Sequence, residues 1–266
     1  MNKINNSQFS ILNFQLIAAF LLLSVSSCDV IPENERIVDM EKVVPLKKVL
    51  LLDFTDQACP NCPKAGVEVN TLKDNYGSDF VPVTIHASSR KLPLVTTDGN
   101  TYDVYFKTRD AGHPAGVIDG KMQPDFYKWG GDVLARFNVV SSLNISLSTE
   151  YNSSSRELKI TSDIKALKNI SGAKMLIWII EDNIVALQLV DNTTVPDYLH
   201  RHIFRAAVNS TWGEALELKV GETKTAEHSL TLDAAWKSDD ISVVAFVYDA
   251  TTDAVYDVQE TKISEN

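Results

Sequence analysis

The chain has 266 residues, 44% of them hydrophobic, and a formal net charge of −10. A chain of this length can bury a sizeable core in one or two domains, and we predict two. An acidic chain without a clear basic block repels polyphosphate, so we expect no nucleic-acid partner.

The beginning of the chain has the pattern of a lipoprotein signal peptide. Lys3 supplies a weak positive region, and the apolar run 16–25 leads through small residues into Cys28. The run is shorter than the roughly 20 residues of a membrane-spanning helix. We predict a signal peptide over 1–27, lipid on Cys28 and a tether over 28–45. An ordinary secretory signal or an uncleaved anchor is the alternative.

The remaining cysteines form a single pair. The chain has three cysteines, and lipid on Cys28 leaves only Cys59 and Cys62, in the sequence Cys-Pro-Asn-Cys. Export places this pair in a compartment where disulfides persist.

An α/β pattern follows the tether. Residues 47–55 are a continuous apolar run, typical of a strand buried on both faces. The cysteine pair comes next, and apolar residues at helical spacing predict a helix after it. A second strand is predicted over 80–86, a short helix over 100–109 and a last helix from Pro124. We therefore predict an α/β domain over residues 46–138.

The pattern changes to β further along the chain. Residues 143–151 and 158–164 alternate apolar and polar side chains around an Asn-Ser-Ser-Ser turn. More β-rich runs follow, about seven short strands in all, without a convincing helix. We predict an all-β immunoglobulin-like sandwich over residues 139–266, resting on strand count alone.

The cysteine pair is the main candidate for chemistry. Cys59, after a strand and at the start of a helix, lies near unpaired backbone N–H groups that favour thiolate. Cys62, one turn further on, can resolve a mixed disulfide formed by Cys59. A fixed structural disulfide and a metal site are the alternatives, but a structural zinc needs four ligands. We expect no metal and no cofactor.

Asp53 is a second candidate, because it stands within the apolar run before the cysteines. A buried carboxyl is costly unless it has a role or a partner. We favour proton transfer over a satisfied hydrogen-bonding group. His200 and His202 could face the same side of a strand and share a metal, but we interpret them as edge or loop residues.

Residues 51–62 (LLDFTDQACPNC) resemble the active-site strand and turn of the thioredoxin superfamily, including an acidic residue six positions before the first cysteine. The resemblance implies that Asp53 helps to move the proton of the second cysteine. It also implies that Pro114 is the family's cis-proline, against which a substrate strand pairs.

The same resemblance covers about residues 46–137 and implies that His113, Pro60 and Asn61 line a substrate groove. The chain departs from the family at Ala58, where thioredoxins have Trp, and at Pro63.

A second resemblance covers nearly the whole chain. The lipid-attachment region, the CPNCP turn and the segments 198–208 and 211–215 resemble the 28-kilodalton outer-membrane lipoprotein family of Gram-negative bacteria. It implies a thioredoxin-like domain joined to a β-sandwich, at the outer membrane, facing the periplasm or the surface, with an adhesin or receptor role.

Three functions are therefore open. The first is thiol–disulfide exchange, with exported protein thiols or disulfides as partners and the lipid at Cys28 as membrane anchor. The second is non-enzymatic surface binding with the thioredoxin fold as a scaffold. Copper handling by the reduced pair is a third. The sequence does not indicate an oligomeric state.

Overall fold

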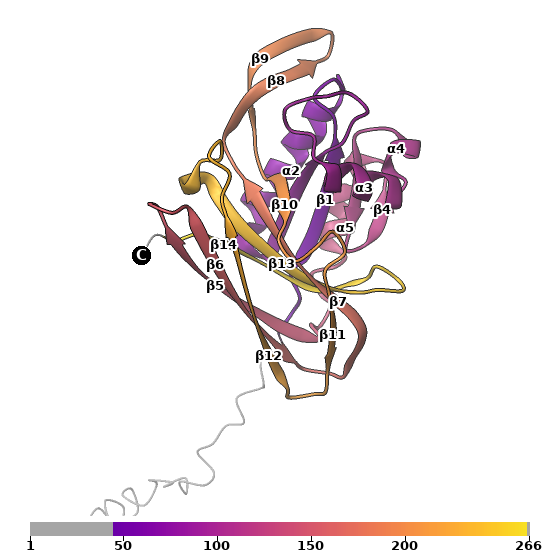
Figure 1. The fold of residues 1–266 in the computed structure, drawn as a ribbon. Helices are drawn as coiled ribbons and strands as arrows, with labels where there is room; N and C mark the ends of the chain where they lie inside the picture. The colour runs from indigo at the N-terminus through magenta and orange to yellow at the C-terminus, as the bar shows by residue number, and fades with distance from the viewer. Residues whose placement is uncertain (1–44, 265–266) are drawn as a thin grey trace, which may run out of the picture. The chain divides into compact units, whose positions relative to one another are not determined.

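A long mixed β-sheet organises the computed structural model, which describes residues 45–264 (Figure 1). The predicted signal peptide 1–27, Cys28 and nearly all of the tether 28–45 lie outside the described residues. The structure is mostly β, with a few short helices, and two smaller sheets accompany the long one.

The long sheet has the strand order β14-β13-β7-β10-β2-β1-β3-β4, and β11 also pairs with β7. β1 runs parallel to β2 and antiparallel to β3. The strands of the long sheet are β1 (Val49–Thr55), β2 (Phe80–His86), β3 (Ala115–Ile118), β4 (Lys121–Gln123), β7 (Ile170–Glu181), β10 (Ile203–Ala207), β11 (Glu214–Leu218), β13 (Ile241–Asp249) and β14 (Val255–Lys262).

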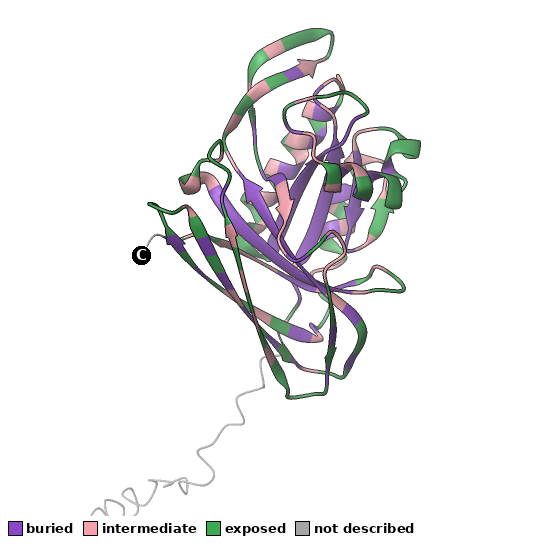
Figure 2. Cartoon of the chain, in the orientation of Figure 1, coloured by how far each residue is buried: buried purple, intermediate pink, exposed green. Residues whose placement is uncertain are grey.

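Every residue of β1 is buried, as expected for a strand covered on both faces (Figure 2). Val49 and Leu51 belong to a core that includes α2 and α5, whereas Leu50 and Leu52 belong to a core on the other face that includes Tyr102 of α3. Successive side chains of a strand point to opposite faces, so one apolar run serves both cores. The helical segments are α2 (Cys62–Tyr76), η2 (Gly77–Asp79), α3 (Thr97–Tyr105), α4 (Thr108–Ala111), η3 (Phe126–Lys128), α5 (Trp129–Leu134) and η4 (Ser238–Asp240).

The helix predicted over 100–109 is two helices in the structure. α3 begins earlier, where the Thr96 side chain accepts a hydrogen bond from Gly99 N–H. Lys107 adopts a left-handed backbone conformation, which a continuous helix does not allow, and α4 begins after it.

The β-rich second half adds a three-stranded sheet of β5 (Leu143–Asn152), β6 (Glu157–Ala166) and β12 (Thr223–Thr231), in the order β12-β6-β5. Inward side chains of β5 and β6 pack against β7, β11 and β13 in one apolar core. β8 (Ile184–Val190) and β9 (Thr193–His200) form a separate hairpin.

The sheet crosses the domain boundary that we predicted between residues 138 and 139. β10 pairs in parallel with β2, with Ile203 opposite Thr84, and Thr84 N–H donates to His202 O at 2.7 Å. Described residues on both sides of the predicted boundary therefore lie in one compact unit.

A buried ion pair reinforces this junction. Lys47 Nζ contacts the Asp119 carboxylate, and both side chains are almost fully buried. Lys47 also donates to Val255 O at 3.1 Å, and Asp119 accepts from Leu50 N–H at 3.1 Å. One pair thus joins the chain before β1, the turn after β3 and the start of β14.

We expect Lys47→Met to lower the free energy of unfolding by about 3–5 kcal/mol, because it leaves the Asp119 carboxylate buried without its closest cation. Lys128→Met is the control: Lys128 pairs with Asp125 on the surface, and its loss should cost about 0–1 kcal/mol. Urea unfolding at pH 7 measures both values. Equal effects would contradict a structural role for the buried pair.

Candidate functional site

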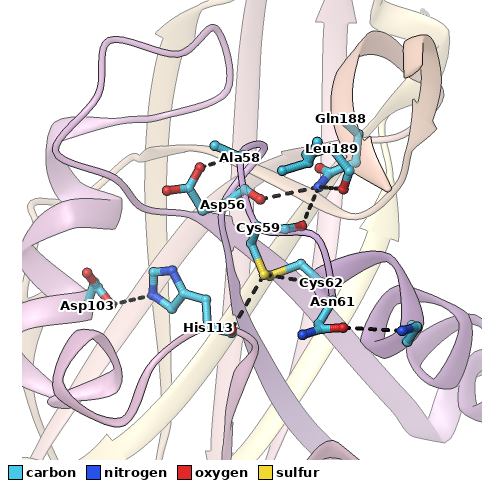
Figure 3. Close-up of a disulfide and its surroundings, with 10 residues drawn as sticks. Asp56, Ala58, Cys59, Asn61, Cys62, Asp103, His113, Gln188 and Leu189 are labelled. Carbon is cyan, nitrogen blue, oxygen red and sulfur yellow. Dashed lines mark hydrogen bonds and ion pairs between the residues drawn. A yellow bond between two sulfur atoms is a disulfide. The ribbon is translucent and has the colours of Figure 1, made fainter. Parts of the chain in front are cut away.

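The predicted cysteine pair is a disulfide in the structure, between Cys59 and Cys62, with the Cα atoms 5.5 Å apart (Figure 3). α2 begins at Cys62, and the Cys62 N–H points at Cys59 Sγ at 3.2 Å. The first N–H groups of a helix have no partner within the helix. One of these N–H groups is therefore directed at the sulfur of Cys59. Cys59 is half-buried, whereas Cys62 is 4% exposed.

Asp53 lies on β1, opposite Thr84 of β2 and Gly116 of β3. It is 2% exposed, and its Oδ1 has no hydrogen-bond partner among the described residues. Burial raises the pKa of Asp53 to about 7, against a smaller opposing effect of His113. The carboxyl can therefore take up or release a proton near neutral pH.

Asp53 and Cys62 line the same small pocket, of about 40 Å³, which is called the inner cavity below. It opens to the surface, since the exposed Leu199 and Arg201 also line it. His86, at the end of β2, and His200, at the end of β9, line it as well, with ring centroids 5.1 Å apart. Both ring nitrogens of His86 and Nε2 of His200 lack partners among residues 45–264. Burial lowers the pKa of His86 well below its usual value, and repulsion from His200 and His113 adds to this effect.

Cys59 faces a different hollow, of about 390 Å³, on the other side of the disulfide. The residues predicted to line a substrate groove, His113, Pro60 and Asn61, all line this hollow. Arg90 and Arg109 line it as well and add positive charge. Cys59 thus lines this hollow, called the outer hollow below, and Cys62 lines the inner cavity.

The peptide bond between His113 and Pro114 is cis, as predicted, and β3 begins directly after it. His113 O lies 3.4 Å from Cys59 Sγ, but the His113 ring points toward Asp103, with Nε2 2.9 Å from Oδ1 (Figure 3). Burial raises the pKa of Asp103, but hydrogen bonds from His113, Thr108 and Arg109 outweigh it, so that the pKa is lowered. The backbone of His113, rather than its ring, contacts the sulfur.

The β8–β9 hairpin contacts the loop that carries the cysteines. Gln188 Nε2 donates to Cys59 O at 3.1 Å and to Asp56 O at 3.3 Å (Figure 3). In the backbone, Leu189 N–H donates to Gln57 O at 2.8 Å and Asp191 N–H donates to Pro60 O at 3.1 Å. The hairpin thereby holds the loop through both side-chain and backbone hydrogen bonds.

Sequence reasoning missed His86, Asp103, Arg90 and the hairpin with Gln188. Asp191-Asn192 between two β-rich runs is a hairpin signal that could have identified β8 and β9. Nothing in the sequence indicates that this hairpin contacts a loop about 130 residues away.

His200 and His202 do not face one side of a common strand. β9 ends at His200, and His202 has a left-handed backbone before β10 begins. Instead, His202 Nδ1 lies 3.3 Å from Asp182 Oδ1. Within residues 45–264, no three His, Cys, Asp or Glu side chains are grouped to hold a metal ion.

Comparison with known proteins gives a family match. The family model described as outer membrane protein Omp28 matches residues 99–266, a range that does not include the cysteine pair. No curated protein sequence matches the chain. No helix in the described part of the chain is long and apolar enough to cross a membrane.

Solved structures show a similar fold. HBP35 of Porphyromonas gingivalis has a TM-score of 0.66 at 14% identity, covering 82% of this chain and 76% of that chain. An Agrobacterium tumefaciens protein has a TM-score of 0.53 at 16% identity, covering 84% and 97%. A domain of the outer membrane lipoprotein Omp28 from Porphyromonas gingivalis is 26% identical over 47% of this chain and 91% of that chain, with a TM-score of 0.36.

The raised pKa of Asp53 predicts a dependence of stability on pH. Between about pH 4 and pH 7 the folded state keeps a proton that the unfolded state releases, so stability falls as pH rises through this window. Asp53→Asn mimics the neutral form. It should therefore stabilise the oxidised protein by roughly 4 kcal/mol at pH 8 and change little at pH 4. Urea unfolding at both pH values measures the difference between the two proteins. If the free energies of unfolding of the two proteins differed by the same amount at both pH values, the raised pKa of Asp53 would be contradicted.

Proposed function

Because the chain belongs to the outer membrane protein Omp28 family, we propose that it is an outer-membrane lipoprotein, anchored through Cys28, that exchanges thiols and disulfides with exported proteins. In this proposal, residues 46–138 form a thioredoxin-like part and residues 139–266 an immunoglobulin-like sandwich, and the two parts share the long sheet. The observation that carries the function is the placement of the two sulfurs: Cys59 at the outer hollow, and Cys62 at the inner cavity with Asp53.

The exchange begins with the reduced pair. The Cys59 thiolate attacks one sulfur of a substrate disulfide. A bond forms between Cys59 and that sulfur, while the other substrate sulfur leaves as a thiolate. In this proposal the Cys62 N–H, 3.2 Å from Cys59 Sγ in the disulfide, stabilises the attacking thiolate.

The second step resolves the mixed disulfide. Cys62 passes its thiol proton to the Asp53 carboxylate and attacks Cys59, so that the Cys59–Cys62 disulfide forms and the remaining substrate sulfur leaves. The substrate gains two electrons and the pair loses two. A pKa of about 7 makes Asp53 a suitable proton acceptor near neutral pH.

The surroundings of Cys59 support an extended polypeptide as the substrate. His113 O contacts the sulfur, and the cis His113–Pro114 bond precedes β3 beside the outer hollow. Backbone carbonyls at such a position accept hydrogen bonds from a substrate strand, independently of its side chains.

Trapping tests this function. Cys62→Ser removes the resolving thiol, so it should accumulate mixed disulfides with exported proteins when the variant is expressed in the envelope. Cys59→Ser is the matched control and should accumulate at least tenfold fewer, because Cys62 faces the inner cavity. Non-reducing electrophoresis measures the complexes. Equal trapping by both variants, or none by either, would sink the proposal.

Surface binding without chemistry is the second candidate, and one observation favours it. The β8–β9 hairpin exposes three large apolar side chains close to the cysteine loop: Val185, Leu187 and Leu199. Clustered apolar side chains on a surface mark interaction sites.

The double variant Cys59→Ser/Cys62→Ser separates the two functions. The exchange proposal expects it to lose disulfide turnover while circular dichroism shows an intact fold. Unchanged ligand or cell binding by this variant, together with no turnover by the wild-type protein, would favour the surface-binding role.

A further inference from the structure

The β8–β9 hairpin contacts the cysteine loop, residues 56–61 between β1 and α2, with a buried side-chain amide (Figure 3). Gln188 of β8 is 2% exposed, and its Nε2 donates to Cys59 O at 3.1 Å and to Asp56 O at 3.3 Å. A third carbonyl oxygen, that of Leu189, lies 3.1 Å from the same nitrogen. The position therefore suits a hydrogen-bond donor and not an acceptor.

The loop makes the reciprocal contact through Gln57, which is fully buried. Gln57 Nε2 donates to Leu187 O of β8 at 2.8 Å, and Gln57 O accepts from Leu189 N–H at 2.8 Å. Asp191 N–H donates to Pro60 O at 3.1 Å. The contacts with the hairpin are thus spread along the loop on both sides of the first cysteine.

The two cysteines differ in what holds their backbone. Cys62 is the first residue of α2, so the helix fixes it. Cys59 precedes the helix and lies in a turn, in which Cys59 N–H donates to Asp56 O at 2.9 Å and Ala58 N–H donates to Asp56 Oδ1 at 2.7 Å. Local turns open at little cost in free energy, because few contacts hold them. The hairpin therefore adds a restraint on Cys59 from a distant part of the chain.

This restraint affects the balance between the disulfide and the two thiols. In the reduced protein, a free loop could carry Cys59 away from Cys62, and disulfide formation would then have to order the loop at a cost in conformational entropy. A loop that is already held avoids this cost and raises the effective concentration of one thiol at the other. We propose that Gln188 is a positioning residue for the cysteine pair, which holds the loop in place and so favours the disulfide.

This inference rests on the proposed exchange function and adds a residue of the β-rich half to its site. Gln188 lies about 130 residues after the cysteines in the chain. The β-rich half then does more than present the redox site, because it sets how readily the pair is reduced.

Equilibration with glutathione tests the proposal. The protein dithiol gives two electrons and two protons to glutathione disulfide, which becomes two glutathione molecules while the Cys59–Cys62 bond forms. Gln188→Met keeps an unbranched side chain and removes the donor. Its equilibrium constant for disulfide formation should be at least tenfold smaller than that of the wild type, which raises the reduction potential by about 30 mV. A potential equal to that of the wild type would overturn the proposal.

Gln259→Met is the matched control. Gln259 of β14 is also partly buried and donates to a backbone carbonyl, Glu260 O, at 3.1 Å, and it accepts from Lys48 Nζ at 2.7 Å. These hydrogen bonds do not involve the cysteine loop, so the reduction potential should stay at the wild-type value. A shift as large as that of Gln188→Met would show a general effect of lost hydrogen bonds and would overturn the positioning role.

A second variant covers the case in which Gln188→Met does not fold, which circular dichroism would reveal. Gln57→Met removes the side-chain link from the loop to Leu187 O. Its reduction potential should rise in the same direction, because the same restraint is weakened. An unchanged potential in the folded variant would count against the proposal as decisively.

The pH dependence separates position from charge, because Gln188 lines the inner cavity together with Asp53. A restraint on the loop gives the same shift at pH 6 and at pH 8, on either side of the Asp53 pKa of about 7. A shift confined to pH 8 would assign the effect to the Asp53 carboxylate and overturn the positioning role. These potentials are measured with glutathione alone, so they stand or fall separately from the trapping of exported proteins.

Discussion

The parallel pairing of β10 with β2 is the constraint on which the rest of the structure depends. It fuses the strands of the cysteine-bearing half and those of the β-rich half into one sheet. The segment that enters β10 is the end of the β8–β9 hairpin, so the same pairing brings His200 to the inner cavity and Gln188 to the cysteine loop. On the opposite face, it places Trp178 of β7 in one core with Leu50 and Leu52 of β1.

Local pattern accounts for the parts of the site that lie close together in sequence. The apolar run of β1, the buried Asp53, the cysteine pair before α2 and the cis His113–Pro114 bond were all predictable. The first three follow from short-range rules, such as continuous apolarity for a strand covered on both faces. The cis bond was expected only from the resemblance to the thioredoxin superfamily.

Other features depend on contacts between distant segments and leave little trace in the sequence. His86 ends an apolar run like many strand-terminal residues, and only the fold shows that it faces His200. A change from α/β to β patterning at residue 139 suggested two separate domains, yet strands from both sides pair in one sheet. Periodicity reports which face of an element is buried but not which element covers it.

The account of function rests on the asymmetry between the two sulfurs, one at a groove and one beside a buried carboxyl. The reduction potential of the Cys59–Cys62 pair, measured against glutathione, tests it most directly. An exchange site should lie within the range of roughly −270 to −120 mV that catalytic pairs span. A value below about −300 mV would mark an inert structural bridge and contradict the account.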